Sequence, residues 1–317
     1  MTLRTDSPAE LRRTFRILGL VGLWLLACMM WGRSGYDHRW IHVLLTFAAL
    51  FLIPMGEKIL TTRGVLPERE PSQLFVWISL FLALMWPPGA MAGCYASIWL
   101  LIRSIIAFQA LWRWSRNRSL APEDLCLLAA ATFPAVGAAW LVAFCAGWMP
   151  FGFDALIVLL TAAHFHHAGF TLPLIAGLIA RERPGRWASW SCMAVLAGVP
   201  LVATGITCTH FGLLPWLEPL GVTLLVLGAF GVAVSQVRLG MAGASPSWPR
   251  WAFVISGMSL LCAMVLALGF GLRHLMPSLA LPMPMMWAIH GSLNAFGFGF
   301  FGLLAWRAIP LAAESKV

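Results

Sequence analysis

Long apolar runs dominate this sequence, and short polar segments separate them. A helix needs about 20 apolar residues to cross a bilayer. Only 10% of the 317 residues are charged, whereas about a quarter are charged in soluble domains. Such a chain could not cover the surface of a soluble fold with polar groups. The pattern therefore predicts an all-α polytopic transmembrane helix bundle. It excludes an ordinary soluble enzyme, a disordered protein and a small disulfide scaffold.

Ten apolar runs are candidate membrane spans. They cover residues 16–32, 40–56, 73–88, 91–112, 124–148, 152–180, 187–208, 214–236, 251–272 and 284–307. The third and fourth are divided at Trp86-Pro87-Pro88-Gly89, where two prolines interrupt the helical pattern. Because the longest loop, 57–72, has only about 16 residues, we interpret residues 1–317 as a single integral-membrane helical domain.

The distribution of basic residues predicts how the spans are oriented. If the N-terminus is cytoplasmic, 17 of the 21 Lys and Arg residues lie in cytoplasmic segments, and only Arg33, Arg39 and Arg273 lie in outer segments. Cytoplasmic loops of membrane proteins carry such an excess of Lys and Arg. The sequence therefore predicts ten spans with both termini cytoplasmic, in a multi-pass protein of the bacterial cytoplasmic (inner) membrane.

The same distribution bears on binding partners. The formal charge of +9 comes from short basic clusters between apolar runs, rather than from the basic stripe that is typical of nucleic-acid binding. We also find no glycine-rich phosphate-binding motif. The expected partners are therefore membrane lipid and a lipophilic small-molecule substrate, and neither a nucleic acid nor a nucleotide.

The sixth span carries three histidines in four positions, His164, His166 and His167. Counted from Asp154 at the outer end of the span, His164 lies about 15 Å deeper, near mid-membrane. An ionisable group at this depth costs several kcal/mol unless it has a partner, so it is a candidate functional residue. His164, His167 and Thr171 are spaced to share one helix face. A lone histidine is more often structural, but this cluster favours a function.

A helix break and a second polar pair accompany these histidines. Pro173 has no N–H to donate, which predicts a kink just after the histidines. His290 and Asn294 lie four residues apart in the tenth span, at a similar predicted depth. They would either form a polar site shared with the sixth span or belong to a seam of small residues that contains one hydrogen-bonded Asn.

Two further charged residues lie within the predicted spans. Arg103 is near the middle of the fourth span, and Glu218 is one turn into the eighth. A guanidinium at this depth needs a carboxylate or carbonyl partner. We expect that partner to be Asp154 or Glu218, the acids best placed from the outer side. These residues together predict a cavity that opens toward the outer leaflet.

Three functions remain open for these residues. The first is an intramembrane enzyme that isomerises or cyclises a polyketide, terpene or lipid, with histidine as acid and base and without a cofactor. The second is a secondary transporter or exporter, and the third is a metal- or haem-binding protein. The candidate catalytic residues are His164, His166, His290, Asn294 and Asp154. The candidate substrate-binding residues are His167, Thr171, Glu218 and Arg103.

Two motifs in these spans resemble the YndJ-like family of bacterial polytopic membrane proteins. The family pattern has His-Phe-His-aromatic-Ala-Gly-Phe in one span and His-Gly-x-x-Asn-Ala-x-Gly-Phe in a later one. The matching residues are His164, Phe165, His166, Ala168, Gly169 and Phe170, followed by His290, Gly291, Asn294, Ala295, Gly297 and Phe298. His167 stands where the pattern has an aromatic residue. The resemblance implies a helical membrane fold and shared roles for His164, His166, His290 and Asn294, but no particular chemistry.

Overall fold

The computed structural model describes residues 8–32, 34–68, 73–242 and 247–309, with side chains from residue 18 onward except at 73 and 74. This part of the chain is all-helical, as predicted, and contains no strand. Its α-helices are α1 (Pro8–Trp31), α2 (Trp40–Phe47), α3 (Ile53–Thr62), α4 (Gln73–Met85), α5 (Ala90–Asn117), α6 (Pro122–Ala146), α7 (Ala155–His166), α8 (Ala168–Glu182), α9 (Arg186–His210), α10 (Leu217–Met241), α11 (Trp248–Gly271), α12 (Met283–Met285) and α13 (Phe301–Ala308).

Short π-helical and 3₁₀ segments complete the chain. The π-helix η1 (Ala48–Leu52) joins α2 to α3, and the π-helices η4 (Met286–Gly291) and η5 (Leu293–Phe300) join α12 to α13. The 3₁₀ turns η2 (Pro150–Gly152) and η3 (Pro277–Leu279) lie in loops. Helices joined end to end act as single rods, so the described residues form ten rods, one for each predicted span.

Eight of these rods are long and apolar enough to cross a membrane, counted over the described residues. The other two contain the shorter apolar stretches Leu18–Trp31 and Phe75–Met85, which coincide with the first and third predicted spans. The chain turns between the end of α4 and the start of α5, so the division predicted at Trp86-Pro87-Pro88-Gly89 is correct. The fold is therefore the polytopic helical bundle that the hydropathy predicts.

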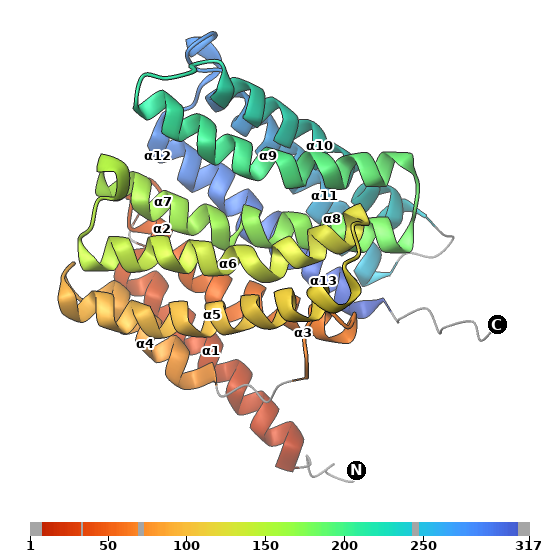
Figure 1. Cartoon of the computed structure of the whole chain (residues 1–317). Helices are drawn as coiled ribbons and strands as arrows, with labels where there is room; N and C mark the ends of the chain where they lie inside the picture. Colours follow the sequence, from red (N-terminus) through yellow and green to blue (C-terminus); the bar gives the residue numbers. More distant parts are fainter. Residues whose placement is uncertain (1–7, 33, 69–72, 243–246, 310–317) are drawn as a thin grey trace.

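Neighbouring rods run in opposite directions (Figure 1), and contacts at the two ends of the bundle fix this arrangement. At one end, Arg181 of α8 binds Asp124 near the start of α6, and Arg63 after α3 binds Glu182. At the other end, the backbone N–H of Gly89 donates to a carbonyl near the end of α6, at 2.8 Å. Segments predicted to be cytoplasmic thus meet at one end, while the orientation of the bundle across the membrane stays a prediction.

The second rod is longer than predicted. We expected the span to end at residue 56 and a loop to begin at Glu57, but α3 continues to Thr62. Glu57 and Lys58 are the first charged residues after this apolar run. Glu57 instead forms an ion pair inside the bundle, so its charge does not end the span. Pro54 has no N–H to donate to the carbonyl one turn earlier. That earlier turn is the irregular η1, which directly precedes α3.

The sixth rod passes through the middle of the bundle and is broken in two. All residues from Gly169 to Ala180 in α8 are buried, and Figure 1 shows α7 and α8 end to end. The break is at His167, which has φ −107° and ψ −80°. It therefore lies at the last histidine, six residues before Pro173, rather than just after the cluster. The facing rule assumes an unbroken helix and does not apply across this break: the His164 side chain is exposed, whereas the His167 and Thr171 side chains are buried.

Helices α9 and α10 pack with their backbones close together where glycine removes a side chain. A Cβ atom added to Gly205 would lie 2.5 Å from the Cα and 2.7 Å from the backbone N of Glu218. Small residues allow membrane helices to pack with their backbones in contact. This contact holds the end of α9 against the start of α10.

Candidate functional site

His164 is the one member of the sixth-span histidine cluster that remains accessible. Its side chain is exposed although it lies ten residues into the rod. Its Nδ1 is 2.7 Å from the Leu160 carbonyl oxygen. A carbonyl only accepts hydrogen bonds, so Nδ1 must carry the proton and Nε2 the lone pair. Nε2 has no hydrogen-bond partner among the described residues. It is therefore a free and accessible proton acceptor, partway along the sixth rod.

His290 and Asn294 form a hydrogen-bonded pair in the tenth rod. The Asn294 Nδ2 group donates to the His290 carbonyl oxygen at 2.9 Å and lies 3.2 Å from His290 Nε2. His290 Nδ1 donates to the Ala263 carbonyl of α11 at 2.9 Å. His290 Nε2 therefore accepts a hydrogen bond from the Asn294 Nδ2 group. Among the described residues, none donates a hydrogen bond to Asn294 Oδ1. Both residues lie in π-helical turns, which occur frequently at functional sites.

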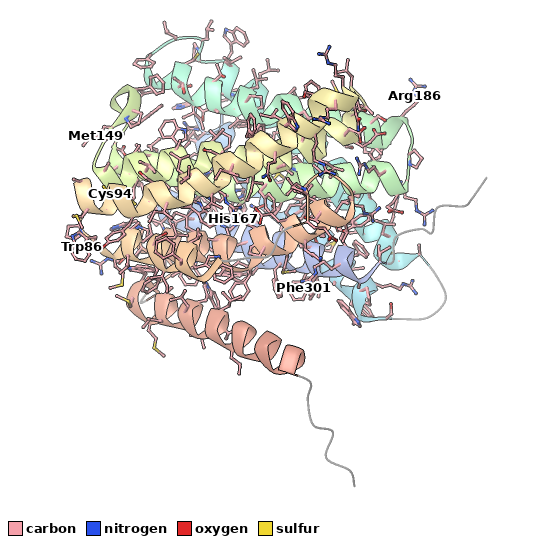
Figure 2. The ribbon with its side chains drawn as sticks, turned by 60° about the horizontal axis from the view of Figure 1, so that its bottom comes forward. Trp86, Cys94, Met149, His167, Arg186 and Phe301 are labelled. Atoms are coloured by element: carbon pink, nitrogen blue, oxygen red, sulfur yellow. The ribbon has the colours of Figure 1, made fainter. Side chains whose placement is uncertain are left out.

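The two polar groups approach each other from distant parts of the chain. The His164 and His290 rings are close enough to interact electrostatically, and His164 also interacts in this way with His167. Figure 2 places His167 about midway between the bundle end that carries Trp86 and Met149 and the end that carries Arg186. His164 Nε2 and Asn294 Oδ1 are thus two unused acceptors on different rods, and His167, which follows His164 in the chain, lies in the middle part of the molecule.

His166 has no ring nitrogen available for chemistry. It is 1% exposed. Its Nδ1 bonds to the Ala162 carbonyl at 2.7 Å, and its Nε2 accepts a hydrogen bond from Trp99 Nε1 at 2.9 Å. The Trp99 ring also stacks on the imidazole, and the Arg103 guanidinium lies 4.4 Å from the Trp99 ring centre. His166 therefore joins α7 to α5, and we assign it a structural role.

Arg103 forms its ion pair with Glu57 of α3. The expectation that Asp154 or Glu218 would be its partner is wrong. The Arg103 side chain is only 5% exposed and the Glu57 side chain 16%, so this arginine is not available to bind a substrate. The sequence interpretation missed Glu57 because it treated this acid as the end of an apolar run. The apolar Ile59 and Leu60 that follow it were the signal that the helix continues.

Asp154 and Glu218 are also engaged with groups other than the histidines. Asp154 is exposed and caps α7, where its carboxylate accepts the backbone N–H of Ile157 at 2.9 Å. Glu218 is buried, and its carboxylate binds Arg273 at 2.5 and 3.2 Å. Among the described residues, no carboxylate is hydrogen-bonded to His164 or His290. Any acid–base chemistry at this cluster would therefore depend on imidazole and amide groups.

His167 and Thr171 stabilise the helix break. His167 Nε2 donates to the Leu44 carbonyl of α2 at 3.0 Å, and Thr171 Oγ1 donates to the His167 carbonyl at 2.7 Å. Both side chains are buried, so the structure does not present them to a substrate. His167 Nδ1 is buried without a hydrogen-bond partner in the described part of the chain.

The described residues contain no group of three or more His, Cys, Asp or Glu side chains placed to hold a metal ion. All seven cysteines are free thiols and belong to no disulfide. The metal-binding hypothesis thus gains no support from the geometry. The cluster of His164, His290 and Asn294 remains the best candidate for a functional site.

These features define a multi-pass helical membrane protein that carries a half-buried His–Asn pair and an accessible histidine. The chain belongs to the YndJ-like family, because the family model described as YndJ-like protein matches residues 43–298. It is 28% identical over 232 residues to the uncharacterized membrane protein YndJ of Bacillus subtilis (strain 168). That match covers 70% of this chain but only 40% of the relative, so the chain spans less than half of the relative's length. No solved structure matches the chain.

Proposed function

We propose that this chain is an intramembrane acid–base catalyst of the bacterial cytoplasmic membrane that isomerises or cyclises a lipophilic polyketide, terpene or lipid. The observation that carries the proposal is the accessible Nε2 lone pair of His164. Its tautomer is fixed by the hydrogen bond to the Leu160 carbonyl. Histidine is the side chain best suited to take up and return protons near neutral pH.

The proposed reaction moves a proton without changing the oxidation state of the substrate. His164 Nε2 removes a proton from one carbon, and the resulting imidazolium returns it to another carbon of the same molecule. Asn294 Oδ1 accepts a hydrogen bond from a substrate hydroxyl, and His290 holds the Asn294 amide in place. Because the proton is returned, the reaction needs neither an oxidant nor a cofactor. Asp154 and His166 have no part in this scheme, since both are engaged in other contacts.

The test uses purified protein in liposomes made from a bacterial membrane-lipid extract, with lipid species followed by chromatography and mass spectrometry. We expect one species to be converted to an isomer or a cyclised product. His164→Gln should lower the rate at least ~100-fold, the usual minimum contribution of a general acid or base. The matched control is His274→Gln, which changes an exposed histidine outside the cluster. If His164→Gln converts lipid at the wild-type rate, the proposal fails.

Asn294→Leu should have a smaller effect on the same reaction. The substitution removes one hydrogen bond to the substrate and leaves His290 Nε2 without its donor. Losing one such interaction costs about 1.4 kcal/mol, so we expect the rate to fall roughly tenfold. The initial rate of lipid conversion measures this effect. An unchanged rate would remove Asn294 from the site while leaving the role of His164 to its own test.

A secondary transporter is the second candidate, and the break of the sixth rod at His167 favours it. Transporters often bind substrates where interrupted helices meet near the midplane. Against coupling to cations, the buried Glu218 and the half-buried Glu57 are both paired with arginine. The liposome experiment separates the two candidates, because a transporter would move a solute across the bilayer without changing its chemical structure.

A further inference from the structure

A cavity of about 620 Å³ opens at the bundle end where α5, α6 and α8 meet. It lies near the C-terminal ends of α5 and α8, at the predicted cytoplasmic side. Its lining includes four arginines, Arg63, Arg113, Arg116 and Arg181, but only one acid, Asp124. The lining therefore has a formal charge of +3.

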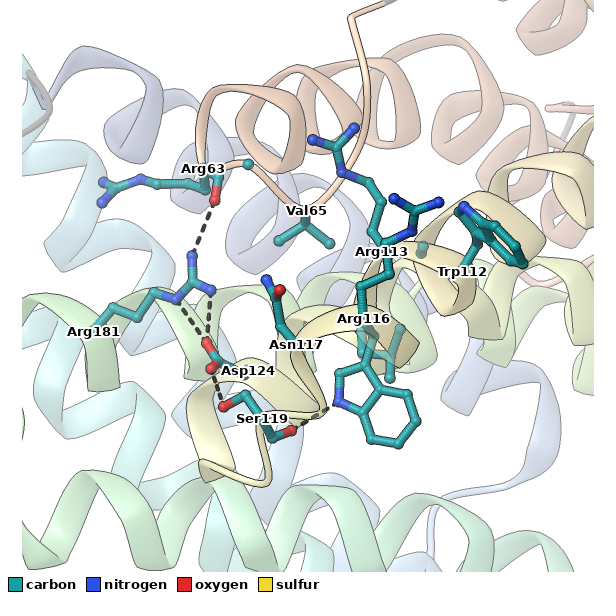
Figure 3. A pocket seen from close by; sticks show the side chains of 13 residues that line it. Arg63, Val65, Trp112, Arg113, Arg116, Asn117, Ser119, Asp124 and Arg181 are labelled. Carbon is teal, nitrogen blue, oxygen red and sulfur yellow. Dashed lines mark hydrogen bonds and ion pairs between the residues drawn. The ribbon is translucent and has the colours of Figure 1, made fainter.

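Two of the four arginines are already engaged. Arg181 binds Asp124 at 2.6 and 3.2 Å and also donates to the Arg63 carbonyl at 3.3 Å. The Arg63 guanidinium binds Glu182. Figure 3 shows Arg181 between Asp124 and the Arg63 backbone, whereas no dashed line reaches Arg113 or Arg116. The acid in the lining is thus neutralised.

Arg113 and Arg116 are the charges left for a ligand. Both are exposed at the C-terminal end of α5, and neither has an acidic partner among the described residues. The Arg116 guanidinium lies 5.1 Å from the centre of the Trp112 ring, a cation–π contact that leaves its N–H donors free. Arginine N–H groups bind phosphate oxygens in a bidentate manner. The cavity therefore offers two guanidinium groups of the kind that bind phosphate.

A second cavity of about 260 Å³ continues from the first along α5. It is lined by Pro67, Phe108, Gln109, Trp112 and Arg113, and so shares Trp112 and Arg113 with the first cavity. Phe108 lies one turn nearer the middle of α5 and stacks with Trp112 at 6.3 Å between ring centres. Phe108 is 65% exposed and Trp112 55%. This second space presents aromatic surface in the direction of the bilayer core.

We propose that the two cavities together bind one anionic membrane phospholipid. The phosphate group contacts Arg113 and Arg116 in the larger cavity, and an acyl chain lies over Phe108 and Trp112 in the smaller one. Basic pockets between membrane helices on the cytoplasmic side are suited to anionic lipid headgroups. The adjoining aromatic surface favours a lipid over a free phosphate ion, which has no apolar part. This site is separate from the His164 cluster and does not depend on its chemistry.

The test measures lipid binding by native mass spectrometry after transfer from phosphatidylcholine nanodiscs with and without phosphatidylglycerol. We expect the wild-type protein to retain one phosphatidylglycerol molecule. The double variant Arg113→Gln/Arg116→Gln should bind it about 30-fold more weakly, because each charge contributes about a fivefold factor near a membrane surface. The matched control, Arg183→Gln/Arg186→Gln, removes two exposed arginines outside both cavities and should bind like the wild type.

Two further measurements make the test decisive. Phe108→Ala should weaken phosphatidylglycerol binding while leaving the helix content unchanged, because Phe108 is largely exposed. Inorganic phosphate alone, added to protein in phosphatidylcholine nanodiscs, should not reproduce the thermal stabilisation given by phosphatidylglycerol. Equal stabilisation by phosphate, with no effect of Phe108→Ala, would overturn the lipid assignment in favour of a soluble anion. Equal losses in the two double variants would overturn the site itself.

Discussion

Replacing Arg103 with methionine is expected to lower the free energy of unfolding by about 3–5 kcal/mol, the usual cost of breaking a buried ion pair. The substitution leaves the Glu57 carboxylate without its partner inside the bundle. It also removes the cation from the face of Trp99, which holds His166 through a hydrogen bond. Denaturant titration of the purified protein in detergent, followed by circular dichroism, measures the change.

A double-mutant cycle separates the ion pair from simple loss of packing. Glu57→Leu alone should also destabilise the protein, because it strands the buried guanidinium. The double variant Glu57→Leu/Arg103→Met removes both charges and should recover most of the lost stability. Arg183→Gln, at an exposed position, is the control and should shift stability by no more than about 0.5 kcal/mol. An Arg103→Met protein as stable as this control would show that the pair has no structural importance.

Replacing Gly205 with valine should destabilise the bundle by about 3 kcal/mol, at the upper end of the usual cost of overpacking. The new Cβ would meet backbone atoms of Glu218, at 2.5 Å from Cα and 2.7 Å from N. Backbone cannot rotate away as a flexible side chain does, so α9 and α10 must separate. That separation would also disturb the ion pair between Glu218 and Arg273. The same denaturant titration measures the loss.

Gly22→Ala provides the contrast for this prediction. Gly22 is exposed in α1, and a Cβ added there meets nothing within 4 Å. Alanine is the better helix former, so this variant should be more stable by about 0.5–1 kcal/mol. If Gly205→Val and Gly22→Ala changed stability equally, close contact between α9 and α10 could not be the reason for the glycine at position 205.

The features of the fold that depend on local sequence were predictable. Apolar runs and paired prolines are visible in any short window, so the ten rods and the turn at Trp86-Pro87-Pro88-Gly89 were placed correctly. The end of the second rod was not placed correctly, because it depends on an ion pair between Glu57 and a residue of another rod. Glu57 marks the end of a span only if no cation meets it, and Arg103 comes from a helix 46 positions away.

The candidate site was only partly predictable for a similar reason. The spacing of His290 and Asn294 already places them on one helix face, and they are hydrogen-bonded in the structure. The spacing of His164, His167 and Thr171 was misleading, because the helix breaks at His167. The arginine-lined cavity was missed because its basic residues were used only to orient the spans. Arg113 and Arg116, beside Trp112 on one short stretch, were the available signal.

The underwound turns of the tenth rod have a geometric consequence. From Met286 to Phe300 nearly every backbone hydrogen bond spans five residues, whereas in an α-helix it spans four. Suppose that one π-helical turn near Phe300 changed to α-helical hydrogen bonding. The part of the tenth rod that precedes this turn would then rotate by about 100° relative to α13, which is the rotation per residue in an α-helix. The imidazole of His290 would then turn away from the Ala263 carbonyl while Trp306 kept its place. A shift of register by one residue would thus be enough to dismantle or rebuild the polar cluster without unfolding the rod.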